Sequence, residues 1–128
     1  MCGLAGLQRL DRNHATGLSG AAMATTLAHR GPDAVGDWTC PSGTLELGFR
    51  RLAIRDLDPR ANQPMVSANG RFVIIYNGEV YNFQELRIDL EKLGHKFRGH
   101  SDTEIMLAAI SQWGIIKAVK SFDGMFAF

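Results

Sequence analysis

The sequence predicts an α+β domain with antiparallel strands, and three observations support this class. The order of the segments is a strand, a helix, several strands in succession, two helices and a last strand. Two of the strand-like segments are joined by a short turn sequence, which is typical of an antiparallel hairpin. The chain has 128 residues, so we expect about one domain around one core. This order of elements predicts a layered architecture.

The N-terminal half is expected to contribute three strands and one helix. Segment 2–8 is small and apolar and predicts a strand, and the polar segment 11–17 predicts a turn. Segment 18–30 is rich in Ala and Leu, which predicts a helix that ends before a Gly-Pro-Asp turn. Segments 34–40 and 44–54 carry β-favouring residues, and the Pro-Ser-Gly between them predicts an antiparallel hairpin.

The C-terminal half is expected to contain a buried strand and two helices. Residues 55–64 are polar and rich in turn formers, and the continuous apolar run at 72–76 predicts a strand covered on both faces. One helix is predicted from Asn82 to Leu93, with Asn82 capping together with a glutamate three residues later, and another begins with the capping sequence at Ser101. The first of these helices is expected to bury one apolar face: Phe83, Leu86, Leu90 and Leu93.

The last segment, 122–128, predicts one more apolar strand, and the sequence stops inside it without a turn or a polar end. An apolar strand edge without a neighbour must meet water or another chain. We therefore expect residues 1–128 to be the N-terminal part of a longer domain. A homodimer is an open alternative for covering that edge.

Charge and composition exclude several classes of function. The chain carries 14 Lys and Arg against 13 Asp and Glu, a net charge of +1, so neither nucleic acid nor a membrane is an expected partner. No secretory signal or membrane-spanning segment is visible, which favours a cytoplasmic location. Cys2 and Cys40 are too few for a disulfide framework. The four histidines lack the spacing of a zinc site, so no metal is expected.

Cys2 allows two interpretations. It can be a small buried hydrophobic residue at the start of a strand, as free cysteines often are. Alternatively, removal of Met1 would make Cys2 the terminus, with a thiol nucleophile and a free amine on one residue. The α-amine titrates near pH 8, close to the thiol, so it can act as the base. The dipeptide alone favours the first interpretation.

Asn77 and Gly78 follow the buried apolar segment. A side-chain amide and a backbone N–H at the end of a strand can together stabilise an oxyanion. The alternative is an ordinary Asn-Gly hairpin turn. Both interpretations remain open on these residues alone.

Two charged positions could recognise an α-amino acid. One arginine of the sequence FRRLAI could present its planar guanidinium to a carboxylate, although an exposed strand charge is the more common fate of arginine. Asp102 lies in the first turn of a predicted helix, where it either complements the helix dipole or pairs with a substrate ammonium.

The motifs of the chain, in their order and spacing, resemble the class II glutamine amidotransferase domain found at the N-terminus of glutamine-dependent asparagine synthetases. The resemblance covers essentially the whole chain. It rests on MCGLAG at the terminus, AHRGPDAVG at 28–36, RLAIRDL at 51–57, NQP at 62–64, YNGEVYNF at 76–83, GHSDTEIML at 99–107 and DGMFAF at the end.

The resemblance implies an N-terminal nucleophile hydrolase fold, an αββα sandwich, that hydrolyses L-glutamine to glutamate and ammonia. In this family Cys2 would attack the side-chain amide, with its own amine shuttling the proton. Asn77 and Gly78 would hold the oxyanion. The remaining pocket residues implied by the motifs are Arg51, Leu52, Ile54, Glu79 and Asp102, with Arg51, not Arg50, binding the substrate carboxylate.

The family's glutaminase domain is longer than this chain, and the synthetase domain with its ATP site is absent. No cofactor is therefore expected here, and ATP and Mg²⁺ are expected only for the missing synthetase domain. The expected partners are L-glutamine and that C-terminal synthetase domain. His29 is given a structural role, because its motif does not supply the base in this family. The branches that form glucosamine phosphate or phosphoribosylamine carry different residues around these motifs.

Alternatives to an ammonia-supplying domain of an asparagine synthetase stay open. A glutamine-binding regulatory module without turnover is consistent with a chain that keeps Met1, because the Cys2 amine is then blocked. An amidotransferase that serves an acceptor other than aspartate would carry the same motifs in this segment.

Overall fold

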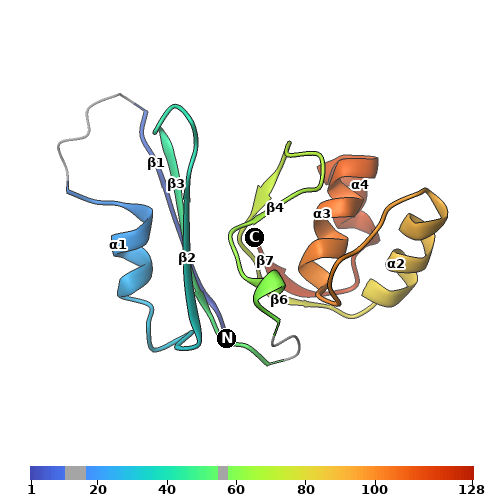
Figure 1. The fold of residues 1–128 in the computed structure, drawn as a ribbon, viewed down its shortest axis with the longest axis horizontal. Helices are drawn as coiled ribbons and strands as arrows, with labels where there is room; N and C mark the ends of the chain where they lie inside the picture. Colours follow the sequence, from blue (N-terminus) through green and yellow to red (C-terminus); the bar gives the residue numbers. More distant parts are fainter. Residues whose placement is uncertain (11–16, 55–57) are drawn as a thin grey trace.

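The computed structural model describes residues 1–10, 17–54 and 58–128. The turns predicted at 11–17 and 55–64 lie partly outside the described residues. Figure 1 shows four successive layers: helix α1 (Gly20–Thr25), a three-stranded sheet, a layer of shorter strands, and a layer with helices α2 (Phe83–Lys92), α3 (Asp102–Trp113) and α4 (Ile115–Ser121). The predicted α+β class with antiparallel strands is confirmed.

The first sheet has the order β1-β3-β2, from β1 (Gly3–Gln8), β3 (Leu45–Arg51) and β2 (Ala34–Thr39). Both pairings are antiparallel, so the predicted hairpin is confirmed. The strand predicted at 44–54 ends at Arg51, because the chain beyond it bonds to other segments instead of to a strand. The sheet therefore brings the start of β1 beside the end of β3.

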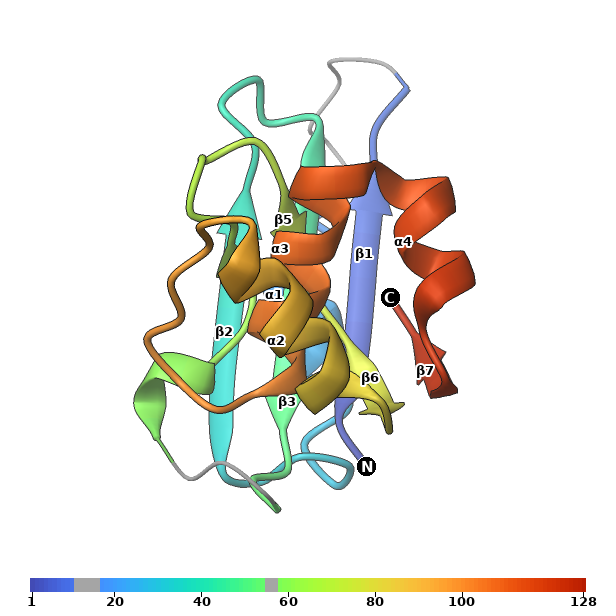
Figure 2. The same ribbon diagram turned by 90° about the vertical axis from the view of Figure 1, so that its right-hand side faces the viewer.

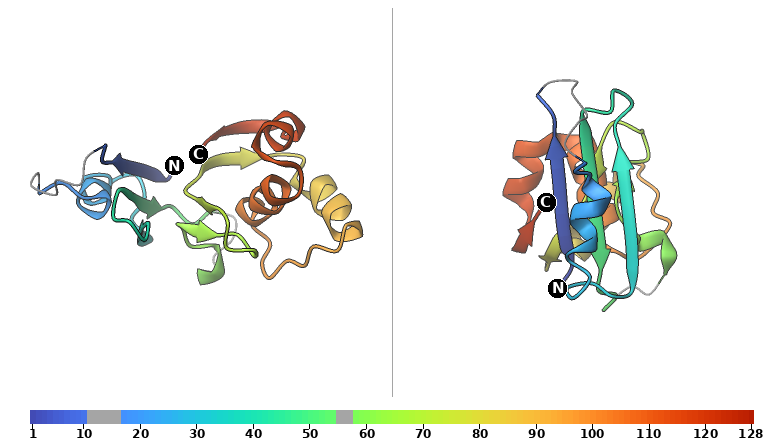
Figure 3. Two further views of the ribbon diagram at one scale, coloured as in Figure 1. Left: turned by 90° about the horizontal axis from the view of Figure 1, so that it is seen from above. Right: turned by 90° about the vertical axis from the view of Figure 1, so that its left-hand side faces the viewer.

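Helix α1 covers the outer face of this sheet (Figure 3, right) and is shorter than the predicted segment 18–30. Thr25 and Thr26 return their hydroxyls to the carbonyls of Ala21 and Met23, and the bonds after Thr25 tighten to a three-residue spacing. The helix lies very close to β3, since a Cβ at Gly48 would be 2.1 Å from the Gly20 carbonyl oxygen.

The layer of shorter strands consists of two antiparallel pairs. Strand β4 (Met65–Val66) pairs with β5 (Val73–Ile74), and β6 (Asn77–Val80) pairs with β7 (Gly124–Ala127). The continuous strand predicted at 72–76 is wrong in extent, because the N–H of Tyr76 donates to the Gln63 side chain instead of to a strand. The cover on its two faces is uneven: Ile74 and Tyr76 are buried, whereas Val73 and Ile75 on the other face are partly exposed.

The main core lies between the layer of shorter strands and the helices. Figure 2 shows this helical side of the molecule, with α2, α3 and α4 in front of the strands. Leu86 and Leu90 of α2 are buried there, as predicted, but Leu93 is 54% exposed because it follows the last residue of the helix. The core also receives Ile74, Tyr76, Val80, Ile105, Met106, Leu107, Ala109, Ile110 and Ala118.

The two predicted helix caps differ in outcome. The Ser101 side chain accepts the Glu104 N–H, so this cap is confirmed. Asn82 precedes α2 as predicted but makes no side-chain cap. Its amide instead donates to the Ser121 carbonyl at 2.9 Å and accepts the Asp123 N–H at 3.0 Å. The side chain thus joins the start of α2 to the segment that leads into β7.

Gly36 of β2 is a point of close approach between the three-stranded sheet and the segment that leads into β4. A Cβ at Gly36 would lie 2.0 Å from the backbone oxygen of Gln63, whereas a Cβ at Gly6 would meet only a leucine methyl at 3.7 Å. We expect Gly36→Ala to lower the free energy of unfolding by about 1–3 kcal/mol. Chemical denaturation measures the change, with Gly6→Ala as the matched control. Equal stability of the two variants would contradict the close approach of these segments.

Candidate active site

Cys2 lies at the start of β1, next to the end of β3. The Leu52 N–H donates to the Cys2 sulfur at 3.4 Å, and the same sulfur lies 3.8 Å from the Leu52 carbonyl oxygen. The Arg30 Nε donates to the Cys2 carbonyl at 3.2 Å. The residue is half-buried, and both its sulfur and its carbonyl are hydrogen-bonded. The structure therefore brings together two predicted site residues, Cys2 and Leu52.

The segment 28–36 holds the residues that follow β3. The Asp33 carboxylate accepts the Ala53 N–H at 2.7 Å, and the Asp33 N–H donates to the Arg51 carbonyl at 3.0 Å. His29 of the same segment is exposed, and no hydrogen bond of the described residues joins it to Cys2. Ile54 is 74% exposed and is the last described residue before the gap at 55–57.

Arg51 and Arg50 point to opposite faces of β3, because successive side chains of a strand alternate. Arg51 is 8% exposed and turns toward the segment that leads into the shorter strands. Its Nη1 donates to the Asn62 Oδ1 at 2.6 Å and to the Asp58 carbonyl at 3.1 Å. This buried guanidinium is therefore oriented by the chain that follows β3.

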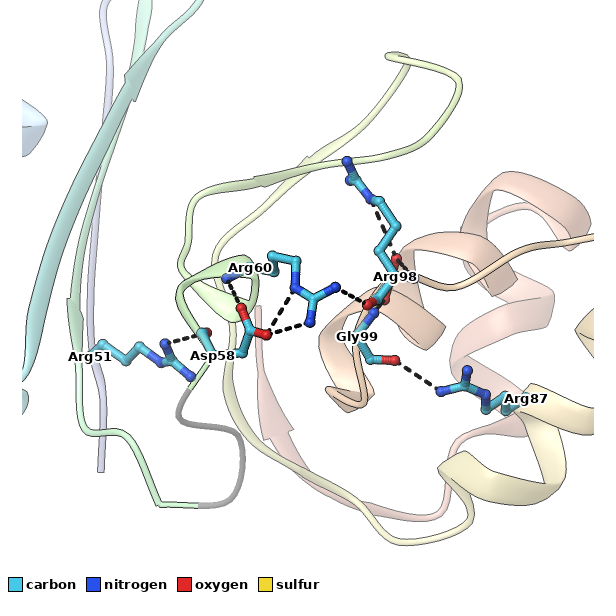
Figure 4. A network of polar contacts seen from close by, with 7 residues as sticks. Arg51, Asp58, Arg60, Arg87, Arg98 and Gly99 are labelled. Carbon is cyan, nitrogen blue, oxygen red and sulfur yellow. Dashed lines mark hydrogen bonds and ion pairs between the residues drawn. The ribbon is translucent and has the colours of Figure 1, made fainter.

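Figure 4 shows that these contacts continue toward the helices. The Arg60 Nε donates to the Asp58 carboxylate at 2.9 Å, and its Nη1 donates to the Arg98 carbonyl at 2.7 Å. Hydrogen bonds from the Arg60 side chain and then from its backbone lower the pKa of Asp58 to about 2. Because this pKa is lower than that of a free carboxyl group, the Asp58–Arg60 pair contributes to stability at any pH above the ordinary carboxyl pKa. The contribution disappears as the pH falls through about 2, where Asp58 becomes protonated.

Asp102, at the start of α3, is bonded to the strand layer. Its Oδ2 accepts the Tyr76 hydroxyl at 2.6 Å and the Val80 N–H at 3.1 Å. Burial, followed by the hydrogen bond to Asp102, raises the pKa of Tyr76 above its ordinary value. Asp102 therefore does more than complement the helix dipole, because it also accepts hydrogen bonds from the strand layer.

Gln63 connects the segment that orients Arg51 with the segment around Asp102. Its Oε1 accepts the Tyr76 N–H at 2.5 Å, and its Nε2 donates to the Thr103 hydroxyl at 3.3 Å. The preceding residue, Asn62, holds Arg51. Four residues that the sequence reasoning did not single out thus join the predicted recognition residues: Asn62, Gln63, Tyr76 and Thr103. Their signal was present, because two of them form the NQP motif and one begins YNGE.

Asn77 and Gly78 are strand residues of β6 and form no hairpin turn, so that alternative is wrong. Tyr76 and Val80 are buried against the helices, so Asn77 and Glu79 point to the opposite face of the strand. None of the hydrogen bonds of the described residues joins Cys2 to Asn77 or Gly78.

The N–H of Gly78 points away from β7. Tyr81 donates its N–H to the Asp123 carbonyl at the end of the β6-β7 pair, whereas the Val80 N–H goes to Asp102. Because N–H directions alternate along a strand, Gly78 shares the direction of Val80. A Cβ at Gly78 would be 2.3 Å from the Met125 carbonyl oxygen, so only glycine fits this close strand pair.

Metal-binding and membrane-spanning features are both missing from the described residues. No group of three or more His, Cys, Asp or Glu side chains in the described part of the chain is arranged to hold a metal ion. None of the helices described here is long and apolar enough to span a membrane.

Known proteins resemble this chain over its whole length. A family model, described as a glutamine amidotransferase domain, matches residues 1–128. This chain belongs to that family. The class predicted from the motifs is thereby confirmed at the level of the amidotransferase domain.

Curated relatives of this amidotransferase domain are much longer proteins. Asparagine synthetase [glutamine-hydrolyzing] 1 of Bacillus subtilis is 40% identical over 106 residues, which cover 83% of this chain and 16% of that protein. A putative asparagine synthetase of Mycobacterium tuberculosis is 36% identical over 143 aligned residues, covering 100% of this chain and 22% of that protein. Amidase chry2 of Gibberella zeae is 38% identical over 102 residues, 80% of this chain and 15% of that protein.

Proposed function

We propose that this amidotransferase domain hydrolyses L-glutamine to glutamate and ammonia, with Cys2 as the nucleophile. The observation that carries the proposal is the position of the Cys2 thiol at the start of β1, beside the Leu52 backbone, in a chain that matches the family from end to end. The four layers of Figure 1 support the αββα sandwich of N-terminal nucleophile hydrolases as its fold.

The reaction proceeds by acyl transfer. After Met1 is removed, the α-amine of Cys2 takes the thiol proton and the sulfur attacks the side-chain carbonyl carbon of glutamine. The tetrahedral oxyanion accepts hydrogen bonds from the Asn77 amide and the Gly78 N–H, whose direction away from β7 leaves it available. The protonated amine returns the proton to the leaving nitrogen, ammonia departs and a γ-glutamyl thioester remains. Water then attacks this thioester, which releases glutamate and restores the thiol.

The pocket recognises the α-amino acid end of glutamine by charge. Arg51 is the ligand of the α-carboxylate, because its guanidinium is buried and oriented by Asn62. Asp102 is the ligand of the α-ammonium. Backbone groups of Leu52 and Ile54, together with Glu79, complete the pocket.

The ammonia serves a C-terminal synthetase domain, for which ATP and Mg²⁺ are required; no residue of this chain is assigned to either. Aspartate is the acceptor we propose, in keeping with the two relatives named as asparagine synthetases. The relative named as an amidase supports an acceptor other than aspartate as the second candidate. The proposed location is the cytoplasm.

Removal of Met1 tests the proposed mechanism. Met1 is 71% exposed, so keeping it should leave the packing unchanged while locking the Cys2 nitrogen in a peptide bond. In the full-length protein, we expect an extension in front of Cys2 to lower the rate of ammonia release by about 10²- to 10⁴-fold, the contribution of a general base. Proteolytic removal of the extension, which leaves Cys2 first, should restore the rate. Equal rates with and without the extension would refute the mechanism.

A further inference from the structure

We propose that Tyr76 is a positioning residue that orients Asp102 and thereby sets the preference for a substrate with an α-amino group. The inference rests on the proposed function, because it assigns Asp102 to the substrate ammonium. In this proposal Tyr76 acts through its hydrogen bond to Asp102 and not by contact with the substrate.

The hydrogen bonds of Asp102 are unevenly divided between its two oxygens. Oδ2 accepts both the Tyr76 hydroxyl at 2.6 Å and the Val80 N–H at 3.1 Å. Among the described residues, no hydrogen bond reaches Oδ1. The protein therefore saturates one oxygen and fixes the carboxylate plane, while the other oxygen remains for a cationic ligand.

The ring and the backbone of Tyr76 are both fixed by their surroundings. The residue is 4% exposed and belongs to the core cluster with Val80 and the helices. Its backbone N–H is fixed at the other end by the buried Gln63 side chain. Because burial and Asp102 both raise the pKa of this phenol, it stays protonated and donates throughout the neutral range.

Loss of this donor changes the orientation of Asp102 more than the packing around it. Phenylalanine keeps the ring in the core and removes only the hydroxyl. Without it, Oδ2 keeps only the longer bond from Val80, and the carboxylate can rotate away from the ammonium. A hydrogen bond to a charged group contributes about 1.5–3 kcal/mol, so binding of an α-amino substrate should weaken by about 10- to 100-fold.

The test compares glutamine with 4-carbamoylbutanoate, which is glutamine without the α-amino group, in the processed full-length protein. For Tyr76→Phe we expect the KM for glutamine to rise by about 10-fold or more at little changed kcat, and the KM for 4-carbamoylbutanoate to stay unchanged. An equal rise for both compounds, or no rise for either, would overturn the inference. Tyr81→Phe is the matched control, since Tyr81 is 53% exposed in the same motif, and it should change neither constant.

Asp102→Asn separates this inference from the proposed function. If Asp102→Asn does not raise the KM for glutamine more than the KM for 4-carbamoylbutanoate, the proposed pocket is wrong. If Asp102→Asn raises the KM for glutamine selectively and Tyr76→Phe does not, only the role of Tyr76 is wrong. Should Tyr76→Phe fail to fold, 3-fluorotyrosine at position 76 keeps the packing and alters the hydroxyl. A selective change in the glutamine KM then supports the inference, and an equal change for both compounds contradicts it.

Discussion

Replacing Cys2 with alanine is expected to reduce ammonia release from glutamine to the uncatalysed background in the full-length protein. The substitution removes the atom that would form the proposed thioester. The fold should persist, because the hydrogen bonds of the Cys2 side chain to the described residues are long sulfur contacts with Leu52, and a small residue fits the half-buried position. Ammonia release measures the loss, and circular dichroism with thermal unfolding checks the fold.

Cys40 provides the matched control for this substitution. It lies in the turn between β2 and β3, while Cys2 lies at the other end of β3, so the two thiols are at opposite ends of the first sheet. Hydrogen bonds from Ser42 and Thr44 lower the pKa of the Cys40 thiol to about 6, so reactivity toward thiol reagents alone does not identify the nucleophile. Cys40→Ser should keep full activity. Loss of activity in Cys40→Ser with retention in Cys2→Ala would exchange their roles.

Replacing Asn77 with alanine is expected to lower kcat by about 10²- to 10³-fold with little change in KM, the effect of losing one oxyanion donor. Asn77 points away from the helical core, so the expected cost in stability is small. Steady-state kinetics of glutamine hydrolysis separates the two constants. Asn69→Ala, in a turn where the side chain accepts bonds from Ser67 and Arg71, should leave both constants unchanged. A change confined to KM in Asn77→Ala would exclude the oxyanion role.

Local signals in the sequence were sufficient for much of the fold. The hairpin of β2 and β3 follows from β-favouring segments around Pro-Ser-Gly, and α3 begins at the Ser101 cap as predicted. The inward face of α2 at Leu86 and Leu90 follows from helical spacing. In each case the deciding interactions join residues that are close in the sequence.

Predictions failed where a distant polar group competed with a local one. Asn82 gives up its cap for the backbone around Ser121 and Asp123, and Tyr76 gives its N–H to Gln63 instead of to a strand. No local periodicity encodes such contacts, because they depend on which segments meet after folding.

In the candidate site, too, local motifs were predictable and contacts between distant segments were not. Cys2, Arg51 and Asp102 were chosen from motifs, and the structure adds the side chains that orient the last two. The opposite directions of Arg50 and Arg51 could be anticipated from strand alternation. The connection through Gln63 could not, because it depends on the approach of the NQP segment to Tyr76 and Thr103.

The most direct test of the central claim is to trap the covalent intermediate. The processed full-length protein is mixed with glutamine, quenched in acid within one turnover, and digested for peptide mass spectrometry. The account predicts a γ-glutamyl thioester on the peptide that begins with Cys2, and none on the peptide that contains Cys40. An adduct on Cys40, or rapid ammonia release with Cys2 unmodified at every quench time, would contradict it.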